Sequence, residues 1–177
     1  MRELDVVYCG NGLSGMSTSV TRVLADLRRL EPRGANDIRV ATICGDVEVV
    51  VRIRVSKRRA WLGYTSLADS HDPGVRQEAE WFRTAHAVVL VLDSRRARQD
   101  AVRYAIGRLT SDCVELGIGQ PATVYQLNRR DDPTAVPVEE VTAALEGPIN
   151  CVESIATLGV GVLEAFQRSV KLALLKS

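Results

Sequence analysis

Short apolar runs alternate along the chain with longer segments of helical periodicity. Runs rich in valine and isoleucine predict strands, and segments in which apolar residues recur every three or four positions predict helices. The predicted strands are 4–8, 38–43, 47–55, 60–67, 87–92, 122–127 and 149–152, and the predicted helices are 17–30, 70–84, 97–116, 138–145 and 162–176. Strands that alternate with helices indicate an α/β fold with a mostly parallel central sheet and helices on both faces.

Some segments also predict burial or a turn. The run 87–92 is continuously apolar, which is typical of a central strand covered on both faces. The segment 31–37 is rich in helix-breaking residues and predicts a loop, and the charged run 57–59 predicts a hairpin tip. Helix 97–116 predicts one buried stripe. Its members are Ala101, Tyr104, Ala105, Arg108, Leu109 and Cys113.

The composition is typical of a single domain spanning residues 1–177. A net charge of +1 gives no electrostatic basis for binding nucleic acid or a membrane surface. The apolar runs are too short to span a bilayer and the first residues lack the apolar core of a signal peptide, so we expect a cytoplasmic protein. The four cysteines form no C-x-x-C pair, which favours a structural role in the reduced state.

The strongest functional signal is the glycine-rich loop between the first predicted strand and helix. Backbone N–H groups at a helix N-terminus bind phosphate in this context. The pattern G-x-x-x-x-G-K-[ST] is met by Gly10, Gly15 and Ser17, but Met16 occupies the lysine position. The alternative role of Ser17 and Thr18 is to cap the helix. The predicted phosphate loop comprises Gly10, Asn11, Gly12, Leu13, Ser14, Gly15, Met16, Ser17 and Thr18.

Two later loops also follow predicted strands. One is Asn128-Arg129-Arg130-Asp131, and the other is Ser154-Ile155-Ala156. Alone, the first of them is more typical of an ordinary polar turn before Pro133, but its position directly after a predicted strand favours a binding loop. Because ligands bind at the carboxyl ends of the strands in such sheets, we expect the three loops to form one site.

With these motifs the chain resembles the Ras-type small GTPases, and more closely the bacterial MglA group, whose members control cell polarity and gliding motility. The resemblance is carried by 6–15, by 125–131 with 137–141, and by 156–162, and it is poor from 30 to 82. It implies a P-loop GTPase fold of the Ras-like type. It also implies GDP or GTP with Mg²⁺ as the ligand, and Ser17 keeps the hydroxyl that would ligate the metal.

The resemblance assigns roles to the later loops. Asp131 would accept hydrogen bonds from N1 and the exocyclic amine of guanine, and Asn128 would brace the base and the loop. Arg129 replaces the family's lysine along the purine face, where a planar guanidinium can also stack. Ser154 and Ala156 would place a backbone N–H against the guanine oxygen.

The phosphate end departs from the family pattern. Met16 has no charge, and loss of a charge-assisted phosphate contact costs about 1.5–3 kcal/mol. Where the MglA group has Tyr-Thr-x-x-Gly-Gln, this chain keeps Thr65 but carries Ala68 and Asp69 in place of the glycine and glutamine. The glycine senses the γ-phosphate in the family, so the departures fall on triphosphate binding and hydrolysis.

These departures predict an MglA-related pseudo-GTPase with weakened or absent GTP binding and hydrolysis and no catalytic residues, which acts as a regulatory protein-interaction module. By family analogy the partner is a roadblock-type dimer or another polarity protein. The docking face would span 35–82, where Trp61 and Trp81 are either interface or core residues.

Two alternatives remain open. One is a functional GTPase switch with a non-standard phosphate loop, in which an arginine of a partner or of the chain's own loops replaces the lysine. The other is a different phosphorylated ligand.

Overall fold

A seven-stranded sheet of order β2-β3-β4-β1-β5-β6-β7 runs through the computed structural model, which describes residues 2–27, 31–32, 37–44, 47–55, 73–143, 145 and 149–176. The strands are β1 (Arg2–Gly10), β2 (Glu31–Pro32), β3 (Asp37–Cys44), β4 (Val47–Val55), β5 (Ala87–Asp93), β6 (Ala122–Asn128) and β7 (Cys151–Glu153). The helices are α1 (Met16–Leu27), α2 (Pro73–Thr84), α3 (Gln99–Glu115), α4 (Val138–Thr142) and α5 (Val162–Lys176), with short 3-10 turns η1 (Arg96–Arg98) and η2 (Ala156–Leu158).

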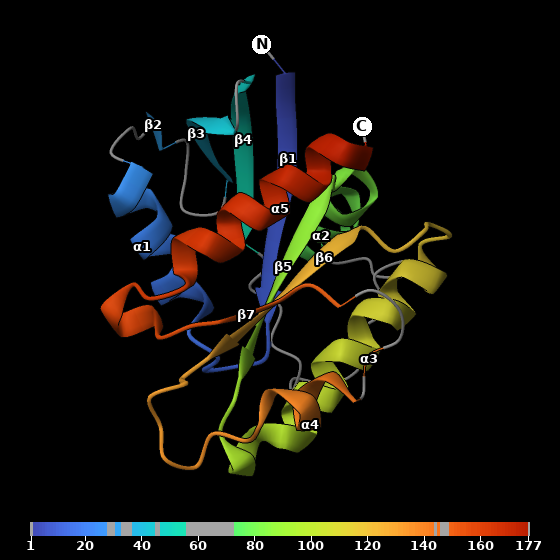
Figure 1. The fold of residues 1–177 in the computed structure, drawn as a ribbon. Helices are drawn as coiled ribbons and strands as arrows, with labels where there is room; N and C mark the ends of the chain where they lie inside the picture. Colours follow the sequence, from blue (N-terminus) through green and yellow to red (C-terminus); the bar gives the residue numbers. More distant parts are fainter. Residues whose placement is uncertain are drawn as a thin grey trace.

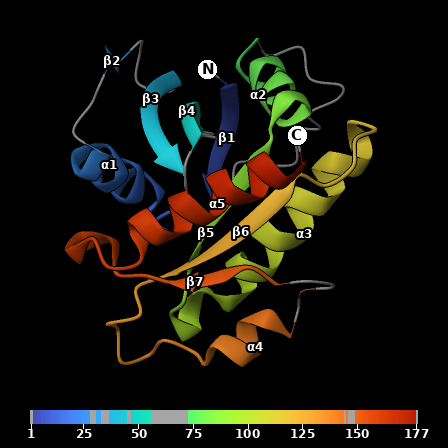
Figure 2. The same ribbon diagram turned by 45° about the horizontal axis from the view of Figure 1, so that its top comes forward.

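The five strands from β4 to β7 in this order are parallel, and β2 and β3 extend the sheet as antiparallel strands. Helices α1 and α5 lie on one face of the sheet, and α2 and α3 lie on the other (Figure 1; Figure 2). The predicted α/β architecture with a mostly parallel sheet is therefore confirmed.

The alternation of side chains along β1 divides the core into two layers. Leu4, Val6 and Tyr8 are buried against α1 and α5, while Val7 points to the opposite layer with α2 and α3. The strand β5 is buried along its whole length, as its continuous apolar run predicts. The parallel register pairs Asp93 with Asn128 and so brings the ends of β5 and β6 side by side at one edge of the sheet.

Several details differ from the sequence-based expectations. Tyr104 is 44% exposed, because the buried stripe of α3 instead includes Val102 and Asp112 beside Ala105, Leu109 and Cys113. Glu31–Pro32 pairs with β3 where a loop was expected. Helix α4 ends at Thr142, before the expected end at 145. Strand β7 begins at Cys151, after the expected start at 149.

Trp81 belongs to the core. It is buried with Ala79 and Phe82 where α2 packs on the sheet, so its expected role in an interface is wrong and its alternative role is correct. The expected strand 60–67, the hairpin tip 57–59 and Trp61 lie outside the described residues.

Among the side chains that the structure describes, Cys9, Cys113 and Cys151 form no disulfide; Cys113 is buried, and Cys9 and Cys151 are half-buried. Within the described ranges no cluster of histidine, cysteine and acidic side chains could hold a metal ion. None of the helices described is both long and apolar enough to cross a bilayer.

Tyr8 provides a test of the packing between β1 and α5. Its side chain is fully buried, and its hydroxyl has no hydrogen-bond partner in the described part of the chain. An unpaired buried hydroxyl is destabilising by about 1–3 kcal/mol. We therefore expect Tyr8→Phe to leave the free energy of unfolding unchanged or raise it by about 1 kcal/mol, as measured by urea denaturation at neutral pH.

The same variant has a pH signature. Burial raises the pKa of Tyr8 above its ordinary value of 10.0. The unfolded chain therefore loses the phenolic proton first, and this contribution to stability is present below pH 10 and lost as the pH rises further. Tyr8→Phe should lose less stability than the wild type between neutral pH and about pH 11. The exposed Tyr104→Phe is the control, and a loss above about 1 kcal/mol in Tyr8→Phe at neutral pH would contradict this account.

Candidate functional site

The loop between β1 and α1 folds tightly at the carboxyl end of the sheet. The N–H of Ser14 donates to the carbonyl of Asn11 at 3.1 Å, and Leu13 and Gly15 adopt left-handed conformations with φ of 66° and 92°. The side chains of Asn11 and Ser14 are buried, and their polar atoms have no partner within the described ranges. The loop thus presents the first N–H groups of α1 at this edge, which is an arrangement that attracts anions.

Helix α1 begins at Met16, directly after the left-handed Gly15. Ser17 and Thr18 are exposed and already lie within the first helical turn, so neither is the N-cap residue and the capping alternative is wrong. Met16 is half-buried and packs against the apolar layer between the sheet and α5. The position of the family's lysine is therefore occupied by a side chain that contributes to the core.

Asn128 connects the three loops. Its Nδ2 donates to the carbonyl of Ser14 at 2.7 Å, and its Oδ1 accepts from the backbone N–H of Ala156 at 2.8 Å and from Oγ of Ser154 at 3.3 Å. All of these groups are buried, so the bonds are shielded from competing water. The bracing role expected for Asn128 toward the loop is the role that it has in the structure.

A second buried amide supports the same junction. Nε2 of Gln126 donates to Oγ of Ser19 at 2.8 Å and to Oγ of Ser154 at 3.1 Å. Gly15 lies so close to Asn128 that a β-carbon at this position would be 2.2 Å from Nδ2 of Asn128. Only glycine fits here, because the backbone is also left-handed.

A pocket with about 300 Å³ of empty space, part of it open to solvent, lies over this junction. The lining residues are Gly15, Thr18, Asn128, Arg129, Asp131, Ile155, Ala156 and Thr157. The structure therefore brings together residues of all three loops. Ser154 lies behind the pocket, and Thr157 was not expected from the sequence, although it directly follows the third loop.

The backbone donors of the third loop differ from the expectation. The N–H of Ser154 donates to the carbonyl of Leu127 at 2.7 Å, and the N–H of Ala156 is engaged by Asn128. The two N–H groups expected to meet a ligand are thus already paired. In the described part of the chain the N–H of Thr157 makes no hydrogen bond that is assigned to another group, so it is one donor available to a ligand in the pocket.

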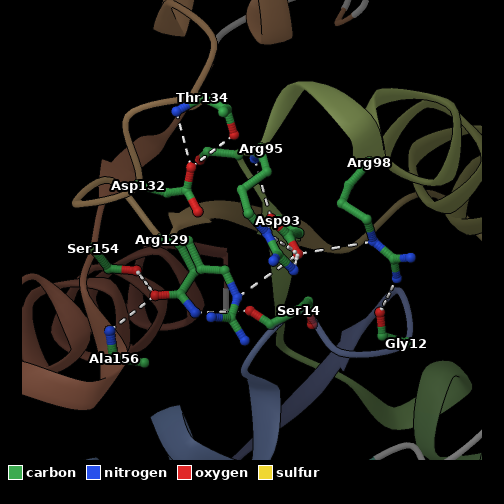
Figure 3. Close-up of polar contacts among 12 residues, drawn as sticks. Gly12, Ser14, Asp93, Arg95, Arg98, Arg129, Asp132, Thr134, Ser154 and Ala156 are labelled. Carbon is green, nitrogen blue, oxygen red and sulfur yellow. Dashed lines mark hydrogen bonds and ion pairs between the residues drawn. The ribbon is translucent and has the colours of Figure 1, made fainter.

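Asp93, at the end of β5, is a site residue that the sequence analysis missed. Its carboxylate is fully buried and accepts hydrogen bonds from Nε of Arg95 at 3.0 Å and from NH2 of the same side chain at 2.7 Å. Nε of Arg98 and Nε of Arg129 lie 3.8 Å and 3.7 Å from Oδ2 of Asp93 (Figure 3). An aspartate directly after a buried parallel strand was the available signal.

Arg98 extends this cluster to the glycine-rich loop. Its NH2 donates to the carbonyl of Gly12 at 2.5 Å. Arg129, from the loop after β6, lines the pocket and has a left-handed backbone with φ of 63°. Asp93 therefore lies between a side chain that contacts the glycine-rich loop and one that lines the pocket.

The remaining expected site residues, Thr65, Ala68 and Asp69, lie outside the described residues. Neither the models of protein families nor the curated proteins include a match to the chain. The functional inference therefore rests on the sequence motifs and on the geometry of the pocket.

A pair of glycine substitutions tests the contact between the loop and Asn128. Gly15→Ala should lower the free energy of unfolding by about 2–3 kcal/mol, because the backbone is left-handed and the added carbon displaces Asn128. Gly107→Ala, in α3 where the β-carbon meets open space, should raise it by about 0.5–1 kcal/mol. Equal effects of the two substitutions in urea denaturation would show that Gly15 does not pack as described.

Proposed function

We propose that the chain is a Ras-like, MglA-related domain of the P-loop GTPase fold, which recognises guanine nucleotide but has weakened or lost GTP binding and hydrolysis. In this proposal it is a pseudo-GTPase that acts as a regulatory protein-interaction module. The observation that carries it is the set of hydrogen bonds by which Asn128 ties the glycine-rich loop to the third loop, beneath one pocket.

The base end of the pocket has groups that complement guanine. Asp131 is exposed and offers carboxylate oxygens, which can accept from two neighbouring N–H groups of a base. The unpaired N–H of Thr157 can donate to a carbonyl oxygen of the same base. Guanine has this combination of two donors and an acceptor on its edges, whereas adenine has no carbonyl oxygen. These groups therefore support a preference for guanine over adenine.

The phosphate end supports binding without hydrolysis. The N-terminus of α1 offers backbone donors, and the exposed Ser17 keeps a hydroxyl that could ligate Mg²⁺. Met16, however, brings no charge to the site and packs into the core. A diphosphate is less dependent on that charge than the transferring phosphoryl group of GTP, where negative charge is greatest. We therefore expect GDP to be the better ligand.

The interaction function follows from the lost γ-phosphate chemistry. A small GTPase switches because the γ-phosphate orders two loops, and a chain that lacks this coupling can serve as a constitutive docking module. The family analogy suggests a roadblock-type dimer or another polarity protein as the partner, and it rests on resemblance alone.

The base specificity provides the direct test. In titration calorimetry the wild type should bind GDP more tightly than ADP. Asp131→Asn should weaken GDP binding about 10- to 100-fold, because an amide presents only one acceptor oxygen and no charge. Asp100→Asn, which removes the same charge from an exposed position on α3, is the matched control and should leave both affinities unchanged. Equal affinities for GDP and ADP in the wild type would refute the proposed function.

A further inference from the structure

The turn between β5 and α3 places three guanidinium groups around one buried carboxylate, but the three are not equally neutralised. Arg95 forms the close, two-pronged contact with Asp93. Hydrogen bonds from Thr134, and then the nearby charges of Arg95 and Arg129, lower the pKa of Asp132. The charges of Arg95 and Arg129 therefore act on Asp132 as well as on Asp93.

Arg98 and Arg129 are both more weakly compensated than Arg95, and of the two Arg98 is the one that contacts the glycine-rich loop. Its carboxylate neighbour in the described part of the chain is Asp93, whose Oδ2 lies 3.8 Å from Nε of Arg98, beyond hydrogen-bond distance. That Nε is buried and has no hydrogen-bond partner among the residues that the structure describes. The side chain is about one-third exposed, at 32%. Arg98 thus combines a positive charge, unused donors and partial access to solvent.

The position of Arg98 relative to the glycine-rich loop determines which part of a ligand its charge could contact. The pocket has Asp131 and Thr157 at its base end and Gly15 and Thr18 beside the N-terminus of α1. From Gly15 the loop runs back to Gly12, whose carbonyl accepts from Arg98. A nucleotide that places its base on Asp131 and its first phosphate at the helix N-terminus extends its last phosphate along this loop.

We propose that Arg98 binds the terminal phosphate of the nucleotide and supplies the positive charge that the loop lacks at Met16. This inference rests on the proposed function, and it adds the group that retains a diphosphate. A guanidinium suits this role because its planar fork can contact two phosphate oxygens at once. The bond to Gly12 is exchanged for, or shared with, a stronger charge-assisted bond to phosphate.

A purely structural role of Arg98 predicts a different result, and the choice of ligands separates the two. If Arg98 only holds the loop in place, its loss weakens the binding of guanosine and of GDP alike. If it binds phosphate, its loss weakens the binding of GDP and of pyrophosphate and leaves the binding of guanosine unchanged. Arg96→Gln is the matched control, because Arg96 lies in the same turn, is 66% exposed and pairs with Glu140.

Titration calorimetry of the full chain with GDP, guanosine and inorganic pyrophosphate tests the proposal. Arg98→Gln should weaken the binding of GDP and of pyrophosphate about 10- to 100-fold and the binding of guanosine less than about 2-fold. Arg96→Gln should leave all three affinities unchanged. Met16→Lys, added to Arg98→Gln, should restore GDP binding to within about 5-fold of the wild type. Equal losses for GDP and guanosine, or no loss for GDP, would overturn the proposal.

A second variant covers the case in which Arg98→Gln unfolds. Arg98→Lys keeps the charge and should retain GDP binding within about 5-fold, so a loss as large as that expected for Gln contradicts the proposal. The outcomes also separate the two levels of inference. Pyrophosphate binding that depends on Arg98, without preference for GDP over ADP, refutes guanine recognition and retains the role of Arg98. GDP affinity that is unchanged in Arg98→Gln, together with a preference for GDP over ADP, refutes the role of Arg98 and retains guanine recognition.

Discussion

The hydrogen bonds of Asn128 are the constraint on which the rest of the candidate site depends. One carboxamide at the end of β6 satisfies the carbonyl of Ser14 and the N–H of Ala156, which come from opposite ends of the chain. Because these groups are buried, removing the carboxamide would leave both backbone groups unpaired, at a cost of about 1–3 kcal/mol each. The floor of the pocket is thus fixed in the absence of a ligand, and only Gly15 allows the loop to approach so closely.

The buried carboxylate of Asp93 provides a second link between the same regions. It lies beside Asn128 in the register of β5 and β6, and the guanidinium groups of Arg98 and Arg129 approach it from the two sides of the site. A buried carboxylate requires such compensation, since desolvation of an unpaired charge is very costly. The fold therefore needs arginines at this position for its own stability, and one of them, Arg98, brings positive charge to the glycine-rich loop.

The sequence predicts the order of the elements well because each depends on local periodicity. The continuous apolar run of β5 and the glycine-rich loop are read directly from neighbouring residues. The position of Tyr104 could not be predicted in this way, since the face that α3 buries is decided by α2 and the sheet. In the site, Asn128 and Asp131 follow from a motif. The pairing of Asp93 with three arginines and the free N–H of Thr157 arise only from tertiary contacts.

In the proposed function the chain keeps guanine-nucleotide recognition and has lost hydrolysis. The most direct test of this function is the identity of the nucleotide released by mild denaturation of the purified protein, with the rate of phosphate release measured on added GTP. We expect GDP in the released fraction and no phosphate release above the uncatalysed rate. An adenine nucleotide in that fraction, or GTP bound stoichiometrically and hydrolysed, would contradict this account.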